Sequence, residues 1–288
     1  MLLPSRYNIA LAKAAYSVLT IGRRAIGLDD ISKVHRGGVN WVLDLREGID
    51  LTIYMTGAFE RGVSRACYRL IRSGNIALDI GANMGVHALH MAVAVGSTGR
   101  VIAVEPTSYP LARLKNNLAA NPALSSRVQI LKALIAASPG QQIPPSIQSS
   151  WRLAGDTTGA HPISRGVPED TAGAESIMID ELAAREDLKN VDFIKIDVDG
   201  AENDVIVGGE RTITSFQPII LLEVQPYTLI ERDLPGDAPV QLLKKMGYQF
   251  ETLNGSPLSA DHRRWVDAIP YGFSRNVVAQ PGHKTKRT

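Results

Sequence analysis

The sequence predicts an α/β fold in which a mainly parallel sheet is covered by helices on both faces. From residue 75 onward, short apolar runs alternate with segments whose apolar residues recur at helical spacing. The runs are so continuously apolar that each strand must be buried on both sides, which is typical of parallel sheets. The runs are IALDI (76–80), RVIAVE (100–105), RVQILKALIA (127–136), VDFIKID (191–197) and PIILLEV (218–224).

Helical patterns follow these strands in the order that such a sheet requires. Helices are predicted over 86–95, 109–121, 201–213 and 239–247, and in the second of them Leu111, Leu114 and Leu118 mark one buried face. Two more runs, 248–253 and 275–280, are predicted to close the sheet.

The chain before residue 75 forms an N-terminal helix and hairpin extension, predicted as residues 1–74. A helix and linker occupy 1–37, a β-hairpin spans 39–57 because apolar and polar residues alternate around REG, and a helix from 58 ends at Gly74. The catalytic domain is predicted over 75–281, followed by a basic tail, 282–288. Residues 138–176 are rich in Pro, Gly, Ser and Thr, and are too long for an ordinary connection, so we expect a lid, an edge hairpin or a partly disordered excursion.

Composition excludes several classes of function. The 288 residues carry a net charge of only +2, which gives no reason to expect nucleic acid as a partner. The single cysteine, Cys67, excludes an internal disulfide and fits a cytoplasmic location. No apolar run approaches the roughly 20 residues of a transmembrane span. The amphipathic N-terminal helix is expected to pack on the domain or to join a homo-oligomer, with contact to a membrane surface as the alternative.

The glycine turn ALDIGANMG (77–85) is the strongest local sign of a ligand site. A buried strand runs into a turn with Gly81 and Gly85 and then directly into a helix, which brings backbone N–H groups close to a ligand. The G-x-x-x-G spacing lacks the glycine trio of a dinucleotide fingerprint. S-adenosylmethionine has no phosphate, so Asp79 can serve its ammonium group and Glu105, ending the next strand, its ribose. The structural alternative is a plain glycine turn and a surface acid.

The segments LDIGANMGVHAL, VIAVEP and VDFIKIDVDGAENDVIVGG, followed by PIILLEV, resemble the FkbM family of S-adenosylmethionine-dependent methyltransferases. The likeness extends over about 39–224, in the same order and spacing. It implies the class I methyltransferase fold, a Rossmann-like, seven-stranded and mostly parallel sheet. It also implies O-methylation of a hydroxyl on a small-molecule acceptor: a sugar, a glycolipid or a polyketide-derived natural product.

The resemblance assigns cofactor contacts residue by residue. The adenine is expected near 133–138, where the family often has an acid and this chain has Ser138. His87 stands where the family usually has an aromatic residue, so it is either a catalytic base or a packing residue. The predicted cofactor-binding residues are Asp79, Gly81, Ala82, Asn83, Gly85, Glu105, Pro106 and Asp197.

The acidic stretch IKIDVDGAEND (194–204) supplies the remaining candidates. Its strand delivers Asp197 to the ligand-binding edge of the sheet, where it can orient or deprotonate the acceptor hydroxyl. The predicted catalytic residues are Asp197, Glu202 and His87, and a divalent metal, if used, would take Asp197, Asp199 and Glu202 as ligands. The register is wrong for a calcium-binding EF-hand loop.

The other acids have structural alternatives. Asp199 can cap the following helix, Glu202 suits its first turn and Asp204 is expected on the solvent face. Glu223 reaches the same sheet edge as a substrate contact.

Weaker candidates lie outside these motifs. Trp151 and His161 in the excursion are possible acceptor contacts, Tyr54 and Glu60 lie in a segment that the family shares, and His90 is expected in the core. Two other functions stay open on the sequence alone: an NAD or nucleotide-sugar oxidoreductase, and a non-catalytic S-adenosylmethionine-binding protein.

Overall fold

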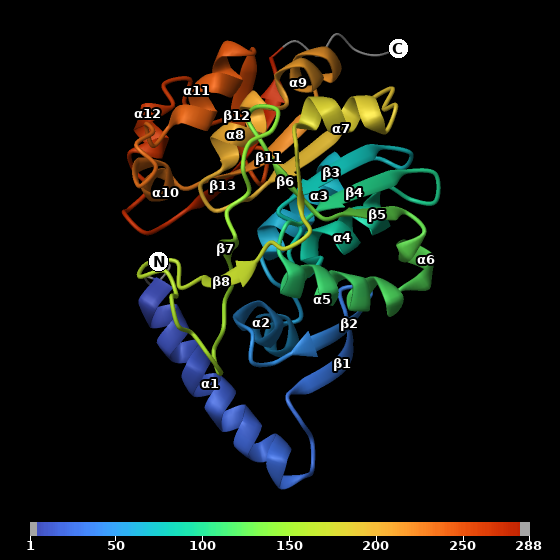
Figure 1. Ribbon diagram of the computed structural model, residues 1–288, viewed down its shortest axis with the longest axis vertical. Coiled ribbons are helices and arrows are strands. Elements are labelled where there is room, and N and C mark those ends of the chain that lie inside the picture. The colour runs from blue at the N-terminus through green and yellow to red at the C-terminus, as the bar shows by residue number, and fades with distance from the viewer. Residues whose placement is uncertain (1–4, 283–288) are drawn as a thin grey trace.

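The computed structural model describes residues 5–282 and contains the predicted seven-stranded sheet (Figure 1). Its strand order is β12-β13-β11-β10-β3-β4-β5, and β13 alone runs antiparallel to its neighbours. The chain order of the strands reverses between β3 and β10, which is where open α/β sheets bind ligands. The strands are β3 (Ile76–Ile80), β4 (Arg100–Val104), β5 (Val128–Leu131), β10 (Phe193–Ile196), β11 (Ile219–Val224), β12 (Tyr248–Thr252) and β13 (Arg275–Pro281).

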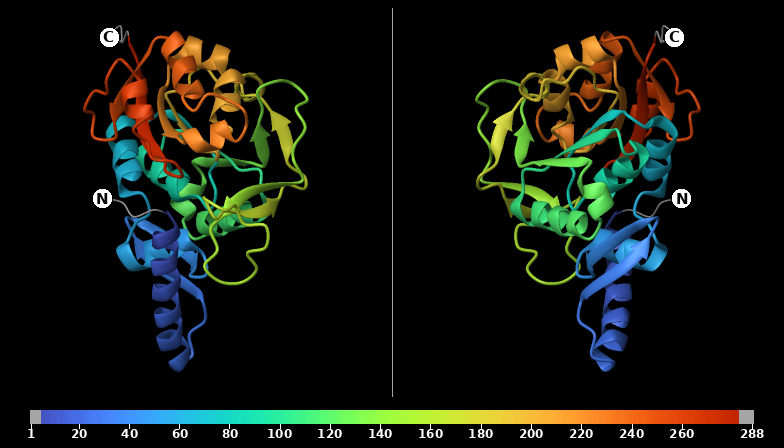
Figure 2. Two further views of the ribbon diagram at one scale, coloured as in Figure 1. Left: turned by 90° about the vertical axis from the view of Figure 1, so that its left-hand side faces the viewer. Right: turned by 90° about the vertical axis from the view of Figure 1, so that its right-hand side faces the viewer.

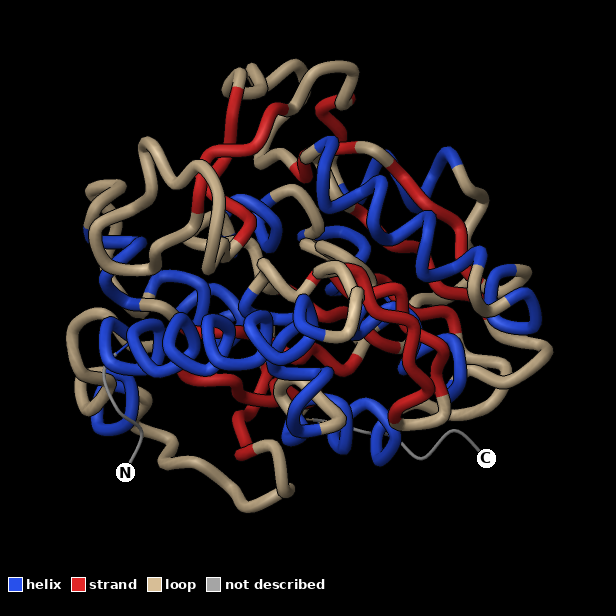
Figure 3. The backbone as a smooth tube through the Cα atoms, turned by 90° about the horizontal axis from the view of Figure 1, so that it is seen from below, coloured by secondary structure: helices blue, strands red, loops and turns tan. Residues whose placement is uncertain are grey.

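The sheet strands and the helices are interleaved in space (Figure 3). Alternate residues of the central strands pack in two different hydrophobic clusters, as the apolar runs predicted. Leu78, Ile102 and Ile194 pack with the layer that contains α7 to α9 and α11. Their neighbours Phe193 and Val101 pack against α3 and α4. The helices after residue 60 are α3 (Arg61–Leu70), α4 (Val86–Ala94), α5 (Ser108–Ala119), α6 (Pro122–Ser125), α7 (Ile179–Arg185), α8 (Glu202–Val207), α9 (Glu210–Phe216), α10 (Pro226–Ile230), α11 (Ala238–Lys245) and α12 (Arg263–Val266).

The predicted hairpin over 39–57 is wrong in its position. The hairpin consists of β1 (Ile31–Arg36) and β2 (Val39–Asp44), and the second half of the predicted hairpin is the helix α2 (Gly48–Thr56). Gly37 and Gly38 both have positive φ, 60° and 79°, as a two-residue hairpin turn requires. Gly37 and Gly38, rather than REG, therefore mark the turn of the hairpin.

The N-terminal helix α1 (Ser5–Ala25) projects from the body, as both side views show (Figure 2). One face is anchored by Arg23, whose guanidinium bonds the carbonyl of Asp29 and the hydroxyl of Tyr54. The opposite face leaves Val18 and Ile21 73% and 72% exposed. Within the described residues, no helix is long and apolar enough to cross a bilayer.

The predicted third strand is divided in two, and the irregular segment contains a hairpin. After β5 the chain leaves the main sheet, and β6 (Ala133–Ile135) pairs instead with β9 (Glu175–Ile177). Between them β7 (Ser146–Ser150) and β8 (Val167–Asp170) form an antiparallel pair. Residues 138–176 thus contain a hairpin, but it forms a two-stranded sheet of its own and is not an edge of the main sheet.

Cys67 lies on α3 and is fully buried between that helix and the sheet. Burial raises the pKa of its thiol to about 12. This side chain is a packing residue, as expected.

Candidate active site

A cleft of about 570 Å³ opens at the carboxyl ends of β3, β4, β10 and β11. This is the switch point of the sheet, and the volume suits a small-molecule site. Six of the eight predicted cofactor residues line it, namely Gly81, Ala82, Asn83, Glu105, Pro106 and Asp197. Asp79 and Gly85 do not line the cleft.

The glycine turn has a backbone that few side chains tolerate. Gly81, Asn83 and Gly85 have φ of 83°, 48° and 95°. A Cβ on Gly81 would overlap the carbonyl oxygen of Asp197, so glycine allows the turn to approach the end of β10.

The N–H groups of this turn are already used within the protein, contrary to the expectation that they face a ligand. Gly81 and Ala82 donate to the carbonyl of Val104, and Gly85 donates to that of Ala82. Asn83 donates to Glu105 at 2.9 Å. The turn therefore contributes a closely packed backbone surface and its carbonyl oxygens to the cleft.

Glu105 combines a structural role with free capacity for a ligand. Its carboxylate accepts hydrogen bonds from the amides of Asn83 and Thr107 and from the Thr107 hydroxyl. A carboxylate has about four acceptor positions, so about one remains. Burial raises the pKa of Glu105, and its side chain is 3% exposed.

Lys195 is the main residue that the sequence analysis missed. It is 1% exposed, and its Nζ lies 2.9 Å from Oδ2 of Asp197 and 3.9 Å from Oδ1 of Asp79. Asp79 is fully buried, and neither of its oxygens has a hydrogen-bond partner. Asp79 is thus placed as a counter-charge to Lys195, although it was predicted to contact the cofactor.

The ammonium group decides the charge of Asp197. Burial acts to raise the pKa of this carboxyl, but Lys195 and a hydrogen bond to Glu223 outweigh it and hold the pKa at about 2. Burial and the charge of Asp197 raise the pKa of Glu223 well above its ordinary value. Asp197 therefore presents an ionised carboxylate at neutral pH, and its side chain is 26% exposed.

His87 lines the cleft together with a strained acid. Its Nε2 lies 3.0 Å from Oε2 of Glu60, while Asn276 donates to the other oxygen of Glu60 at 3.3 Å. Glu60 has φ 43°, a left-handed conformation that is rare for this residue type. His87 is 6% exposed, and its Nδ1 is buried without a partner.

Glu202 and Asp199 do not join Asp197 as a ligand set. Glu202 is fully buried, does not line the cleft, and accepts the amides of Val198 and Gly200. Burial raises the pKa of Glu202 to about 7. Between residues 5 and 282, no group of three His, Cys, Asp or Glu side chains is arranged to hold a metal ion.

Asp199 departs from its expected capping role. It has φ 50°, the N-cap position of α8 is Ala201, and no side chain caps that helix. Desolvation, then the charges of Asp197 and Glu202, raise the pKa of Asp199. Asp204 is also not free in solvent, because it pairs with Arg232 at 2.6 Å.

The weaker candidates divide between the cleft and its surroundings. Trp151 and Glu60 line the cleft, and so do residues 133–135 at the expected adenine position, whereas Ser138 does not. The Nδ1 of His90 lies 2.8 Å from the Tyr68 hydroxyl, in the core as expected. His161 faces Glu231 outside the cleft, and Tyr54 bonds Arg23.

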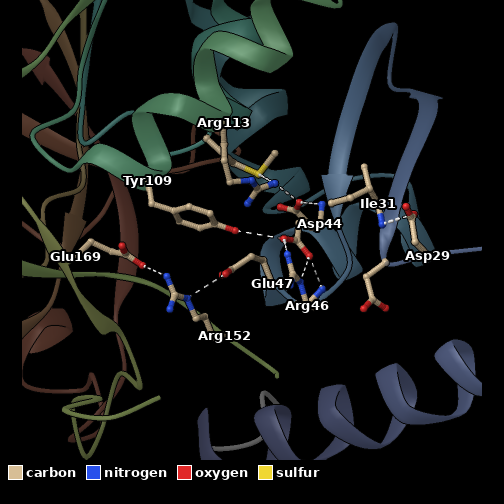
Figure 4. A network of polar contacts seen from close by, with 12 residues as sticks. Asp29, Ile31, Asp44, Arg46, Glu47, Tyr109, Arg113, Arg152 and Glu169 are labelled. Carbon is tan, nitrogen blue, oxygen red and sulfur yellow. Dashed lines mark hydrogen bonds and ion pairs between the residues drawn. The ribbon is translucent and has the colours of Figure 1, made fainter. Parts of the chain in front are cut away.

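A polar network fastens the β7–β8 hairpin to the N-terminal extension (Figure 4). Arg152 pairs with Glu169 at 2.6 Å and with Glu47 at 3.4 Å. Two backbone bonds join the same segments, from Gly48 to the Trp151 carbonyl and from Leu153 to the Arg46 carbonyl. The extension therefore holds the hairpin at the mouth of the cleft.

Comparison with known proteins agrees with this geometry. Residues 79–250 match the model of the methyltransferase FkbM domain. The 2-O-methyltransferase NoeI of Sinorhizobium fredii is 38% identical over 69 residues, 24% of this chain, so the chain spans 28% of that relative's length.

Two solved structures are similar at lower levels. A methyltransferase FkbM from Methylobacillus flagellatus is 16% identical with a TM-score of 0.41, covering 72% of this chain and 43% of that one. An O-methyltransferase from Bacillus cereus in complex with SAH is 15% identical with a TM-score of 0.42, covering 76% and 79%.

Proposed function

The chain belongs to the FkbM methyltransferase family, and on that premise we propose that it transfers the methyl group of S-adenosylmethionine to a hydroxyl of a sugar, glycolipid or polyketide-derived acceptor. The observation that carries the proposal is a single cleft that brings the Gly81 turn and Glu105 together with Asp197, Glu60 and His87. A hydroxyl placed between them has an acceptor for its proton.

Glu105 and the residues around it fit the cofactor. Glu105 has about one acceptor position left, which suits a ribose hydroxyl. Ala133 to Ile135 offer an apolar wall for a base, and glycine at position 81 allows the turn to lie against the Asp197 carbonyl at the end of β10. When bound, the cofactor supplies a methyl group made electrophilic by its sulfonium.

Asp197, Glu60 and His87 position the acceptor and take its proton. Ionised Asp197 accepts a hydrogen bond from the hydroxyl, which directs an oxygen lone pair toward the methyl carbon. As the new O–C bond forms and the C–S bond breaks, the hydroxyl proton passes to Asp197 or to Glu60, which His87 and Asn276 hold in place. A divalent metal stays a prediction, and full turnover in EDTA would contradict it.

We also propose that the exposed face of α1 joins a second copy of the chain in the cytoplasm. Leu11, Ala14, Val18, Ile21 and Ala25 follow one another at alternating steps of three and four residues, and all are exposed. This 3.5-residue repeat is the pattern of a coiled-coil seam.

The cofactor placement is tested with Glu105→Gln. The amide oxygen can replace only one of the two carboxylate oxygens that accept from Asn83 and Thr107, and the charge-assisted bond to the ribose is lost, so the melting temperature of the variant is compared with that of the wild type to establish that it is folded. We expect S-adenosylmethionine to bind about tenfold more weakly by calorimetry. Glu210→Gln, on the exposed face of α9, is the matched control. An unchanged Kd for Glu105→Gln would overturn the placement.

The reaction is tested by measuring S-adenosylhomocysteine formed with a panel of hydroxylated sugars and polyketide-like alcohols. Mass spectrometry then locates the methyl group on oxygen or elsewhere. A methyl group found on carbon or nitrogen would overturn O-methylation while preserving methyl transfer.

A further inference from the structure

The described lining of the cleft offers no cation that a ligand could reach. Among the described residues that line the cleft, the basic side chains are Lys195 and His87. Lys195 is 1% exposed between Asp79 and Asp197, and His87 is 6% exposed with its Nε2 on Glu60. A phosphate or carboxylate on the acceptor would therefore meet Asp197, Asp199 and Glu60 without compensation.

Several polar donors that line the cleft are engaged within the protein. Ser274 and the Gln225 amide nitrogen both donate to Glu223, at 2.5 and 3.1 Å. Asn276 donates to Glu60 and Lys195 to Asp197. The lining then retains the carboxylate oxygens of Asp197, Asp199 and Glu60, with the Trp151 Nε1–H as a donor that has no partner.

The amide oxygen of Gln225 also lacks a hydrogen-bond donor. Gln225 lines the cleft and is 8% exposed, and its Oε1 has no hydrogen-bond donor. A buried amide oxygen without a donor is unfavourable, and a ligand N–H or O–H would satisfy it.

Four aromatic rings also line the cleft. Phe59, Trp151, Tyr227 and Phe273 are all lining residues. Aromatic faces attract ammonium groups, and the attraction grows when the cation is desolvated.

We infer, building on the proposed methyl transfer, that the acceptor is a hydroxyl-bearing amine, such as an amino sugar with a free ammonium group. Its ammonium is held by Asp199 and the aromatic wall while its hydroxyl is placed at Asp197. Phosphorylated and carboxylated acceptors are rejected by the uncompensated carboxylates. The recognition is built from donors on the ligand and acceptors on the protein.

The test uses one hexose framework with four substituent patterns: D-glucosamine, N-acetyl-D-glucosamine, D-glucose and glucosamine 6-phosphate. Each is titrated by calorimetry into the full-length protein saturated with S-adenosylhomocysteine, at low and high salt. We expect glucosamine to bind at least tenfold more tightly than the acetylated and neutral sugars. The phosphate should abolish that advantage, and salt should reduce it.

Asp199→Asn supplies the residue-level test. It should reduce the preference for glucosamine over glucose severalfold, whereas Asp267→Asn, exposed outside the cleft, should leave it unchanged. Equal binding of the amine and its acetylated form, tighter binding of the phosphate, or no binding of glucosamine would overturn the inference.

Failure of the inference is separable from failure of the proposed function. If neutral alcohols from the turnover panel are methylated while the amines are not bound, the methyltransferase proposal stands and the inference on the acceptor falls. If glucosamine binds preferentially but no acceptor is methylated on oxygen, the reverse holds.

Discussion

At the scale of single residues, Lys195 determines the protonation state of the active edge. It stands between two carboxylates in a wall that excludes water, so its charge is as important as its hydrogen bond. Removing one partner of a buried ionic group leaves uncompensated charge, which is strongly unfavourable.

Lys195→Met should raise the pKa of Asp197 from about 2, because the neighbouring cation no longer opposes burial. We expect the acidic limb of the kcat–pH profile to move upward, and activity at pH 7 to fall by roughly tenfold or more, with partial recovery at higher pH. Lys189→Met, on a side chain 80% exposed, is the control. If the variant unfolds, Lys195→Met with Asp79→Asn removes one uncompensated acid, and the same limb should still move. An unmoved limb in a folded variant would refute this role.

Six of the eight cofactor residues predicted from the sequence line the cleft, because they follow strand ends. Glu105 and Asp197 each come directly after an apolar run, and parallel strands bring those positions together. Lys195 was missed because a lysine within FIKID was counted as part of a buried strand. The available signal was a charged residue inside a run too apolar for an exposed position; in the sheet its neighbours are Asp79 on β3 and Leu221 on β11. Ser274 and Asn276 lie about 190 residues from the turn, and no local pattern connects them to it.

At the scale of elements, the β7–β8 hairpin depends on close contact with α2. A Cβ on Gly48 would lie 2.5–2.9 Å from atoms of the Trp151 ring, and the Gly48 amide donates to the carbonyl of the same residue. Such contact leaves no room for a side chain.

Gly48→Ala should displace Trp151 and loosen the hairpin. We expect the KM for the acceptor to rise several-fold and the free energy of unfolding to fall by about 1–3 kcal/mol, the usual range for overpacking. Gly22→Ala is the matched control, because nothing lies within 4 Å of that position in α1, and alanine should stabilise the helix by up to about 1 kcal/mol. Equal effects of the two substitutions on KM would argue against a role for the hairpin in acceptor binding.

The elements that sequence reasoning misplaced share a cause: a non-local contact decides them. Residues 49–55 alternate like a strand, yet they form α2, which packs on β2 with Leu51 and Ile53 buried. The helix predicted over 201–213 breaks at Gly208, where a Cβ would meet the carbonyl oxygen of Ala136 on the strand side. Periodicity alone contains no information on either neighbour.

At the scale of the whole molecule, buried acids give stability a defined dependence on pH. Burial raises the pKa values of Glu202 and Glu47 to about 7 and that of Asp50 to about 6. Between about pH 4.5 and 7 the folded protein therefore binds more protons than the unfolded chain, so the free energy of unfolding falls as the pH rises.

We expect the midpoint of thermal unfolding to be higher at pH 5.5 than at pH 8. Glu202→Gln, which preserves an acceptor for the amides of Val198 and Gly200, should reduce the difference in unfolding free energy by about 1–3 kcal/mol. Glu210→Gln should preserve the wild-type difference, because this side chain is exposed. A wild-type stability that rises over this range would reverse the sign and refute the account.

Association through α1 is the second property of the whole molecule. Val18→Glu places a charge in the proposed seam and should weaken self-association at least tenfold, measured by light scattering over a range of concentrations. Ser17→Glu adds the same charge beside the seam and should have little effect. A wild-type protein that is monomeric throughout would contradict the proposal, and Val18-dependent binding to phosphatidylserine vesicles would assign the face to a membrane.

The burial of Cys67 makes the molecule suitable for site-specific labelling. A thiol that titrates near pH 12 inside the core is inert to maleimides at neutral pH, and the chain has no other cysteine. One cysteine introduced at the exposed Thr157, whose φ is not positive, would be the sole reactive position, so a fluorophore there would follow the hairpin directly. Opening and closing of the cleft can thus be timed in the otherwise native protein, without first removing a thiol.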